Sequence, residues 1–384
     1  MTGLRGKAAF VGATTDFIAG ARGHSALEML ALVAKAAAAD AGISVRDIDG
    51  LFVGMQSEFL STLALSEYLG LRPRFTDNNR LGGSSFLAHT QQAALALDAG
   101  LCDVALICYA SNQRSALGRL QTSVTGTWSD VEAPFEARFP VSSYALSAAR
   151  HMHDYGTRRE DLAAVAVAAR DWARLNPEAF ARDPLRIADV LAQPMVSDPL
   201  GRLDCCLVTD GAAAVIMTRA DRAKDARKAP VYLLGAAAEQ WHKQISAMPD
   251  ICATAASVSG ARARAMAGVG IGDIDVVELY DAFTISTVLL LEDLGFCPKG
   301  EGGRFVSDGH IAPGGSLPVN TNGGGLSCCH PGMYGLFTLV EAIRQLRDEA
   351  GERQVAGADI ALCQGSGGVF SSQVTNILAT GAAL

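Results

Sequence analysis

Apolar and polar positions in the first hundred residues alternate between two periods. The run KAAFVGATT has the pattern of a buried strand, and the apolar residues from Ser25 to Ala41 recur with the helical period until Gly42. Further strands are predicted at IDGLFVG, RFTDN and CDVALICYAS, with helices at SEFLSTLALSEYLG and SSFLAHTQQAALALDAG. Strands and helices that alternate in this way predict a parallel sheet covered by helices on both faces.

The pattern changes between about Asn112 and Leu200, where Arg, Asp, His and Trp become common and helical periods dominate. We expect this stretch to be a largely helical insertion. The strand DGAAAVIMTR then closes a first half, and the charged segment ADRAKDARKAP is the most linker-like part of the chain. Strands and helices restart at VYLLGAAAEQ, which predicts two halves of similar plan, residues 1–225 and 226–384.

Composition and charge exclude several classes of protein. Apolar residues make up 49% and charged residues 19% of 384 residues, as in a compact α/β enzyme. The formal charge is 32 − 40 = −8, so we expect no binding to nucleic acid or to an anionic membrane. Neither a stretch of roughly 18 apolar residues nor a signal-peptide core occurs, and the protein is expected to be soluble and cytoplasmic.

Nine cysteines are too scattered for a disulfide scaffold, although they include the neighbours Cys205-Cys206 and Cys328-Cys329. Neither CxxC nor HxxxH spacing occurs, so we predict no metal site. Most of these thiols are expected to be small buried apolar residues. Cys329 and Cys363 stay open as functional residues because of their neighbours.

The run NTNGGGLSCCHPGMYG is the most informative segment of the chain. Its glycines, Gly323 to Gly325, permit backbone conformations that other residues avoid, and His330 follows just before a predicted helix. Such a loop suits general acid/base work or the binding of an oxyanion. A histidine near a helix start can equally be a cap, and the residues alone leave both interpretations open.

Several blocks of the chain resemble the thiolase superfamily. The run from Asn320 to Pro331 resembles the NxxGGxxxxGHP block of thiolases, with the spacing of the sterol-carrier-protein branch and with Cys329 in place of a glycine. Similar blocks follow the family's order at TDGAAAVIM, VELYDAF, DLGFCPKGEGG and CQGSGG. The resemblance extends from about Ala8 to Leu378.

This resemblance implies a duplicated, five-layered α-β-α-β-α fold and a homodimer built around the strand CDVALICYAS. It implies a coenzyme A thioester as substrate, with no other cofactor bound. In the family a cysteine is acylated, the histidine of the GHP block (here His330) activates it, and a second cysteine moves a proton at the α-carbon, a role open to Cys363. Substrate contacts are expected at Gly83, Ser84, Ser85, Asn320, Gly324 and Gly367.

The sequence departs from the family at the nucleophile. The family's cysteine lies 17 residues before a glycine that matches Gly100, which places it at 100 − 17 = 83, and position 83 is a glycine. Ser84 or Ser85 could replace the thiol, but a hydroxyl is a weaker nucleophile that needs a base. A helix-capping role for these serines is the alternative.

Two phenols enter the expected site. Tyr280 stands where the family has Asn or His, Ala282 stands where the sterol-carrier branch has its second cysteine, and Tyr334 replaces a small residue after His330. In these respects the chain is similar to the thiolase-like aldolases of steroid side-chain breakdown, which lack the cysteine and rely on tyrosines. Those proteins work with a separate OB-fold and zinc-ribbon partner, and this chain is expected to need one.

Three hypotheses follow for the function. The leading one is retro-aldol cleavage of a β-hydroxyacyl-CoA, with Tyr280 and Tyr334 as acid/base or enolate donors and His330 as an orienting or oxyanion contact. The second is a thiolase-type acyltransferase that uses Ser84, Ser85 or Cys363. The third is a non-catalytic thiolase-like subunit of an acyl-CoA complex. The acyl group cannot be inferred from the residues.

Overall fold

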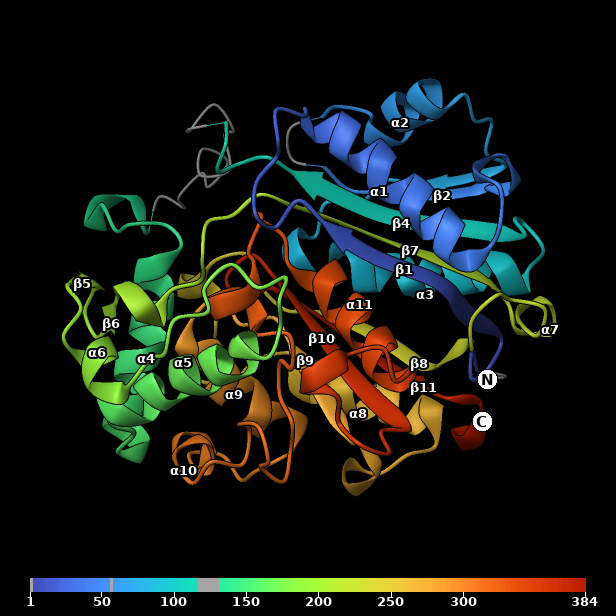
Figure 1. The fold of residues 1–384 in the computed structure, drawn as a ribbon. Coiled ribbons are helices and arrows are strands. Elements are labelled where there is room, and N and C mark those ends of the chain that lie inside the picture. Colours follow the sequence, from blue (N-terminus) through green and yellow to red (C-terminus); the bar gives the residue numbers. More distant parts are fainter. Residues whose placement is uncertain (1–2, 56–57, 117–130) are drawn as a thin grey trace.

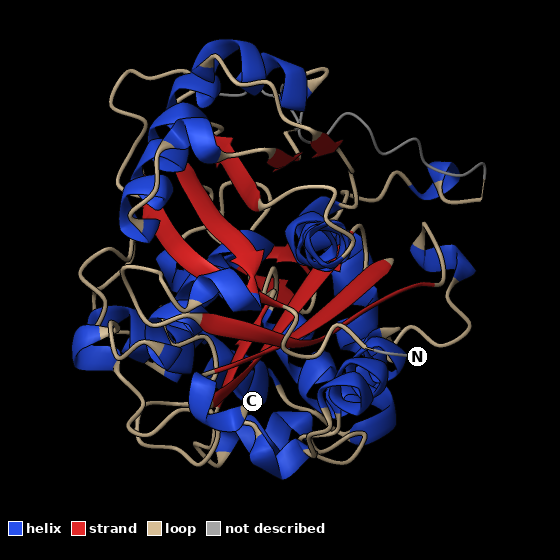
Figure 2. Cartoon of the chain, turned by 90° about the vertical axis from the view of Figure 1, so that its right-hand side faces the viewer, coloured by secondary structure: helices blue, strands red, loops and turns tan. Residues whose placement is uncertain are grey.

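A nine-stranded sheet forms the centre of the computed structural model, which describes residues 3–55, 58–116 and 131–384 (Figure 1). In sheet order its strands are β3 (Phe75–Asp77), β2 (Gly50–Val53), β4 (Val104–Ser111), β7 (Gly211–Arg219), β1 (Ala8–Asp16), β8 (Val231–Gln240), β11 (Ser372–Ala379), β10 (Ile360–Gly367) and β9 (Val276–Leu279). Helices surround these strands (Figure 2), so the predicted α/β class is confirmed. A separate small ribbon contains β5 (Met195–Ser197) and β6 (Leu200–Gly201).

The strand order is repeated in the two halves of the sheet. Outward from the centre, the first half runs β1, β7, β4, β2 and the second runs β8, β11, β10, β9. In each half, the strand that comes first in the sequence is innermost, and the strand that comes last in the sequence lies next to it. The halves meet where Ala9 and Phe10 of β1 pair with Tyr232 and Val231 of β8. The predicted boundary at about residue 225 falls between β7 and β8 and stays a prediction.

The sheet is mixed, so the prediction of a parallel sheet is only partly correct. β2 is parallel to β3 and β4, and β9 is parallel to β10, as expected for strands joined through helices. However, β7 is antiparallel to β4 and β1, and β11 is antiparallel to β10 and β8. The last strand of each half therefore runs against its neighbours, and for β11 the short turn after β10 imposes this direction.

Helices occupy three layers around the strands. α1 (Ala26–Ala41) packs on β1, β4 and β7, and α8 (Ala256–Ala267) packs on β8 and β11. Between them lie α3 (Ser85–Asp98) and α11 (Gly335–Leu346), which contact each other and strands of both halves. The two halves of the sheet form two of the layers, so the order is helix, first half of the sheet, helix, second half of the sheet, helix, which is the predicted thiolase-like arrangement.

Local sequence signals set the ends of α1. The Ser25 hydroxyl accepts a hydrogen bond from the Glu28 main chain, the Glu28 carboxylate accepts one from the Ser25 main chain, and Gly42 ends the helix at φ 73°. Two shorter helices of the first half are α2 (Ser61–Leu69) and α7 (Ala220–Ala223). Among the described residues, no helix has the length and apolar character needed to cross a bilayer.

The predicted insertion is largely helical where the structure describes it, and it ends in the small ribbon of β5 and β6. It contains α4 (Val141–Tyr155), α5 (Arg159–Arg174) and α6 (Ile187–Leu191), which lie beside α9 (Thr284–Leu294) and α10 (Gly302–Ser307) (Figure 1). Residues 117–130 of the insertion lie outside the described residues. His151 of α4 and Glu292 of α9, both buried, lie 3.0 Å apart (Nε2 to Oε1), which fixes the insertion to the second half.

The predicted interface around the strand CDVALICYAS is wrong. All residues of β4 are buried, and the strand pairs with β2 on one edge and β7 on the other. Because both hydrogen-bonding edges are occupied within the chain, β4 cannot pair with a second copy. The predicted homodimer itself stays a prediction.

The cysteines are free thiols in the structure, and all nine lie among the described residues. Only Cys205 and Cys206 are partly exposed, and the rest are buried. Most of the thiols therefore pack as small buried side chains, as predicted.

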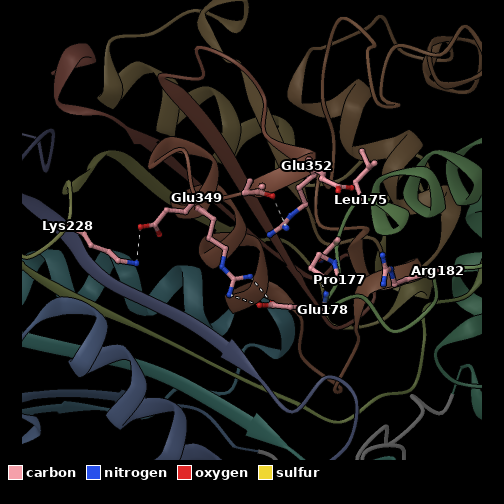
Figure 3. A pocket seen from close by; sticks show the side chains of 12 residues that line it. Leu175, Pro177, Glu178, Arg182, Lys228, Glu349 and Glu352 are labelled. Carbon is pink, nitrogen blue, oxygen red and sulfur yellow. Dashed lines mark hydrogen bonds and ion pairs between the residues drawn. The ribbon is translucent and has the colours of Figure 1, made fainter.

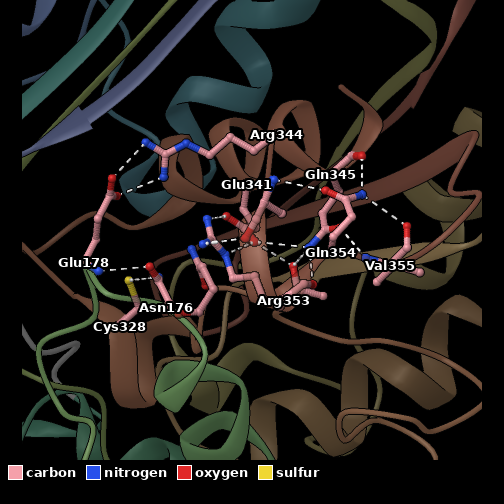
Figure 4. Close-up of polar contacts among 12 residues, drawn as sticks. Asn176, Glu178, Cys328, Glu341, Arg344, Gln345, Arg353, Gln354 and Val355 are labelled. Carbon is pink, nitrogen blue, oxygen red and sulfur yellow. Dashed lines mark hydrogen bonds and ion pairs between the residues drawn. The ribbon is translucent and has the colours of Figure 1, made fainter. Parts of the chain in front are cut away.

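A buried ion pair connects α11 to the turn that follows it, and a hydrogen bond to the same carboxylate connects α11 to the glycine-rich loop that precedes it. Arg353 donates to both carboxylate oxygens of Glu341 at 2.7 and 2.9 Å, and the two side chains are 6% and 1% exposed (Figure 4). The Thr321 hydroxyl lies 2.8 Å from the same carboxylate, and Gln345 donates to that hydroxyl. The position of the glycine-rich loop thus depends on this network.

We expect the substitution Arg353→Leu to reduce the free energy of unfolding by about 3–5 kcal/mol, because it leaves the Glu341 carboxylate buried without its positively charged partner. Denaturant titration measures the change. Arg186→Leu is the matched control, because the Arg186 side chain is 82% exposed and its pair with Asp189 should contribute at most about 1 kcal/mol. Equal effects of the two substitutions would contradict this account.

Candidate active site

Several turns of main chain meet where α3 and α11 begin, and they pack too closely for side chains between them. An ideal Cβ on Gly335 would overlap the carbonyl oxygen of Gly83, and one on Gly367 would overlap that of Leu81. The site is therefore built from four segments, which are the loop 81–84, residues 279–283 after β9, the loop 320–334 and the turn 365–371.

Gly83 contacts the ring of Tyr280. An ideal Cβ on Gly83 would overlap the Cε2 and Cζ atoms of Tyr280 and would lie 2.6 Å from the carbonyl oxygen of Ser366. A side chain at position 83 would therefore need the space that the phenol ring fills. In this site a phenol takes the place that a nucleophilic side chain at position 83 would occupy.

Tyr280 and His330 form a hydrogen-bonded pair. The Tyr280 hydroxyl lies 2.9 Å from Nε2 of His330, and the two rings meet edge to face with centroids 5.5 Å apart. The main chain of His330 donates to the Thr209 hydroxyl at 3.0 Å, and its carbonyl accepts from Gln113 at 2.7 Å. The structure thus brings together two residues that the sequence placed at the site.

Burial keeps both members of this pair neutral. It raises the pKa of the Tyr280 phenol well above its usual value, and the nearby Cys206 thiol and Tyr144 phenol raise it further. Burial also lowers the pKa of His330 to about 4. At neutral pH the pair therefore consists of a phenol that can donate and an imidazole that can accept a proton.

Tyr334 lies next to Tyr280 but has a different hydrogen-bond partner. The two rings are 5.9 Å apart, and the Tyr334 ring stacks on Phe337. Its hydroxyl donates to Oδ1 of Asn322 at 2.8 Å in a fully buried position. Burial, with the nearby Asp281 carboxylate as the next cause, raises the pKa of this phenol well above its usual value. The Tyr334 ring therefore packs against the Tyr280 ring, while its hydroxyl contacts Asn322 and not His330.

The hydroxyl groups of Ser84 and Ser85 form hydrogen bonds within the loop before α3. The Ser84 hydroxyl donates to the carbonyl of Leu81 at 2.9 Å and lies 2.9 Å from the Ser372 hydroxyl. The Ser85 hydroxyl accepts from the Leu81 main chain at 2.9 Å. Both serines are fully buried, and their described contacts include no base. Both hydroxyls are thus engaged with the main chain of Leu81, and the Ser84 side chain makes no capping hydrogen bond to α3.

Cys363 lies in the core on β10. Its side chain is fully buried, and its sulfur donates to the main-chain carbonyl of Thr338 in α11 at 3.6 Å. Burial raises the pKa of this thiol well above its usual value, and the Glu278 carboxyl adds to the increase. The structure thus directs Cys363 toward α11 and does not bring it to the Tyr280–His330 pair among the described contacts.

The glycine-rich loop is held by a carboxylate that sequence reasoning missed. Asp281 is buried and accepts hydrogen bonds from the main chains of Gly325 at 2.6 Å and Leu326 at 3.3 Å. Burial raises its pKa to about 7. A Cβ on Gly324 would overlap this carboxylate, and Asn320, at φ 53°, accepts from the Leu279 main chain at 2.6 Å. The signal available in the sequence was the acidic residue directly after Tyr280.

Two further groups near Tyr280 were also missed. Tyr144, from α4 of the insertion, donates to the carbonyl of Gly368 at 3.1 Å, and its ring packs on Phe283 and Phe370 with centroids 4.3 and 4.6 Å away. The Cys206 main chain donates to the carbonyl of Ala282 at 2.9 Å. The insertion and the segment before β7 therefore both contribute to this site.

A cavity of about 600 Å³ lies behind the glycine-rich loop (Figure 3). Its lining includes Asn176, Glu178, Arg344 and Arg353, and none of the predicted site residues. Asn176 donates to the main-chain carbonyl of Asn322, so the cavity borders the loop from the far side. Glu178 and Arg344 in its wall neutralise each other at 2.9 Å. The cavity is therefore separate from the Tyr280–His330 pair.

Comparisons with known proteins agree with this architecture. Residues 237–380 match the family model described as "Thiolase C-terminal domain-like". The chain is 35% identical to an acetyl-CoA acetyltransferase of Methanothermobacter thermautotrophicus, over 88% of this chain and 90% of that protein. It is 34% identical to 17-hydroxy-3-oxo-4-pregnene-20-carboxyl-CoA lyase of Mycobacterium tuberculosis, over 96% and 98%. A solved structure, the Ltp2-ChsH2(DUF35) aldolase, is 31% identical and superposes with a TM-score of 0.90, with 98% of each chain covered.

We expect Gly83→Ala to destabilise the protein by about 1–3 kcal/mol, because the added methyl group overlaps the Tyr280 ring. Gly272→Ala is the control, since open space surrounds Gly272. In the double variant Gly83→Ala/Tyr280→Ala the ring is absent, so the measured loss should be smaller than the sum of the single losses. Additive losses in denaturant titrations would show that the two residues do not interact.

Proposed function

This chain belongs to the thiolase superfamily, and we propose that it is a lyase that cleaves β-hydroxyacyl-CoA thioesters by a retro-aldol reaction. The observation that carries the proposal is the overlap between position 83 and the Tyr280 ring. It leaves a phenol and an imidazole in a site where acyl transfer would need a thiol. The likeness to proteins named as a lyase and an aldolase supports the same reaction.

Retro-aldol cleavage needs proton transfers and no acyl-enzyme. A base removes the proton from the β-hydroxyl group, the Cα–Cβ bond breaks as the β-carbon becomes a carbonyl, and the bonding electrons form the enolate of the thioester. A proton then adds to the α-carbon. The products are a shorter acyl-CoA and a ketone or aldehyde, and the hydroxyl proton has replaced the broken bond.

The neutral Tyr280–His330 pair supplies the groups for the first transfer. The Tyr280 hydroxyl lies 2.9 Å from Nε2 of His330. With this imidazole nitrogen as the acceptor, the phenolic oxygen can take the proton of the substrate hydroxyl as the phenolic proton moves to the imidazole. The two steps together remove one proton without a free phenolate, which burial disfavours. Tyr334, whose hydroxyl is held by Asn322, keeps the Tyr280 ring in place from the other side.

The glycine-rich loop has few donors left for an oxyanion. The main chain of Gly324 donates to the Asn322 side chain, and those of Gly325 and Leu326 donate to Asp281. We therefore assign to Asn320, Gly324 and Gly367, which the sequence predicted to bind substrate, a role in shaping the site. Stabilisation of the enolate then depends on the phenol and imidazole.

An acyltransferase is the second candidate, because an acetyl-CoA acetyltransferase is among the similar proteins. It would use Ser84, Ser85 or Cys363. The serine hydroxyls are engaged in the loop, and Cys363 faces α11 in the core. These contacts favour the lyase over the acyltransferase.

The names of the relatives guide the choice of substrate and partner. One relative is named for a pregnene carboxyl-CoA substrate and another as a steroid side-chain-cleaving aldolase, so a steroid side chain is the first acyl group to test. The name of the similar aldolase structure joins Ltp2 to ChsH2(DUF35). We include in the proposal a coenzyme A thioester as substrate, a homodimer, and a partner of the OB-fold and zinc-ribbon type.

We expect Tyr280→Phe to lower the rate of ketone or aldehyde release about a hundredfold or more, because it removes the proton-bearing oxygen and keeps the ring against Gly83. Stability should change by less than about 1.5 kcal/mol. Tyr334→Phe and His330→Ala should also lower the rate, and Tyr68→Phe, 51% exposed on α2, should not. The assay supplies a β-hydroxyacyl-CoA together with a zinc-ribbon partner. Equal rates for wild type and Tyr280→Phe would contradict the proposed role, and no release by any protein would favour the non-catalytic subunit.

No covalent acyl-enzyme should form, because the helix start at position 83 carries no thiol. Intact-mass measurement after incubation with acetyl-CoA should therefore show the unmodified mass. The variant Gly83→Cys/Tyr280→Ala, which adds a thiol and removes the overlapping ring, provides the comparison. An acyl group on wild-type Ser84, Ser85 or Cys363 would establish the acyltransferase instead.

A further inference from the structure

A buried carboxylate joins the loop that carries His330 to the segment that carries Tyr280. Asp281, which follows Tyr280 directly, is 1% exposed. Its Oδ1 accepts a hydrogen bond from the main chain of Gly325 at 2.6 Å, and its Oδ2 accepts one from the main chain of Leu326 at 3.3 Å. Both carboxylate oxygens therefore serve as acceptors for the glycine-rich loop.

Gly325 lies between this carboxylate and the imidazole of His330. An ideal Cβ on Gly325 would lie 3.0 Å from Oδ1 of Asp281 and 3.4 Å from Cδ2 of His330. The main chain of Gly325 is thus in contact with both side chains, and Nε2 of the imidazole lies 2.9 Å from the Tyr280 hydroxyl. Because Tyr280 and Asp281 are neighbours in the sequence, these groups form a closed ring of contacts. A shift of the loop therefore changes the distance between Tyr280 and His330.

The two hydrogen bonds to Asp281 require its ionised form. A carboxylate offers two acceptor oxygens, whereas a carboxylic acid turns one of them into a donor. The N–H group of Gly325 or of Leu326 would then face a donor and remain buried without a partner, which is costly. The 2.6 Å distance at Gly325 is short, as expected for an acceptor that carries a charge. Protonation of Asp281 therefore weakens its hold on the loop.

We propose that Asp281 is a positioning residue, whose ionised side chain holds His330 against Tyr280 and whose protonation loosens the loop and lowers the rate of bond cleavage. The inference rests on the proposed function and adds its regulation by pH. Asp281 acts through the main chain of the loop and not on the substrate. The proton that it gains or loses takes no part in the cleavage reaction.

The surroundings of the carboxyl bring its titration into the neutral range. Burial raises the pKa of Asp281 to about 7, and the hydrogen bonds that it accepts oppose this increase. The catalytic pair does not titrate there, because the pKa of His330 is about 4 and burial raises that of Tyr280 well above its usual value. A loss of activity near pH 7 would therefore not come from the pair.

Other titratable groups face Asp281 from each segment that packs against it. They are Glu278 of β9, Tyr280, Cys206 before β7, and Cys329, His330 and Tyr334 of the loop. Burial raises the pKa values of the two thiols and the two phenols, so these groups stay protonated at neutral pH. Arg170 of α5, which donates to the Ser327 hydroxyl of the loop at 3.0 Å, stays charged. Burial also raises the pKa of Glu278, so the experiment must distinguish this carboxyl from Asp281.

The pH dependence of cleavage is the first test. Ketone or aldehyde release from a β-hydroxyacyl-CoA, with the zinc-ribbon partner present, should reach a plateau in wild type above about pH 8 and fall below about pH 7, towards tenfold per pH unit. Asp281→Asn, which has one acceptor oxygen and cannot ionise, should be at least about tenfold slower than this plateau, without a change near pH 7. Glu278→Gln is the matched control and should keep the wild-type pH dependence.

A second measurement uses the wild-type chain alone. Hydrogen–deuterium exchange of peptides that cover Gly325 and Leu326 is compared at about pH 6 and about pH 8, after correction for the intrinsic dependence of exchange on pH. Exchange should be at least several-fold faster at the lower pH, and in Asp281→Asn it should be fast at both. Peptides from α1 should be equally protected at both pH values, which excludes global unfolding as the cause.

The outcomes distinguish this inference from the proposed function. Exchange at Gly325 and Leu326 that depends on pH, without ketone release by any protein, would contradict the lyase and support the hold of Asp281 on the loop. Equal protection of the wild-type loop at both pH values would overturn the role of Asp281 whatever the cleavage assay shows. Cleavage whose loss of rate near pH 7 persists in Asp281→Asn, or is absent in wild type, would overturn it as well.

Discussion

The close packing of the Tyr280 ring against Gly83 is the constraint on which the rest of the site depends. The ring fills the space of a side chain at position 83, so the chain can have a phenol or a nucleophile there, but not both. The glycines at 335, 365 and 367 allow the surrounding main chains to approach the same loop. The absence of a side chain at position 83 and the presence of the phenol ring are therefore parts of one arrangement.

The same packing explains the electrostatics. Because backbone and aromatic rings exclude water, burial raises the pKa of Tyr280 and lowers that of His330, and the hydrogen bond between them joins two neutral groups. Acyl transfer by a thiolate would need the opposite, an environment that favours the charged form. A neutral pair suits a reaction in which one proton moves from an oxygen to a carbon.

Much of this could be predicted from the sequence, because ordered blocks such as the run ending at His330 specify the fold and its site together. Helix ends with strong local signals, such as Ser25 and Gly42 of α1, were also accessible. The antiparallel strands were not, because the direction of β7 and β11 depends on which strands become neighbours in the sheet. For the same reason β4 was mistaken for an interface strand, since its neighbours β2 and β7 occupy both of its edges.

The site itself shows where sequence reasoning ends. Tyr280 and Tyr334 looked equivalent as two phenols beside one histidine, yet one hydroxyl contacts His330 and the other contacts Asn322. Cys206 lies more than seventy positions from Tyr280, and the bridge between Cys205 and Phe283 and the hydrogen bond from Cys206 to Ala282 bring their segments together. Since these contacts join the two halves of the chain, the surroundings of Tyr280 include residues of both halves. The geometry of the site therefore depends on how the two halves of the chain pack against each other, and no single sequence motif specifies that packing.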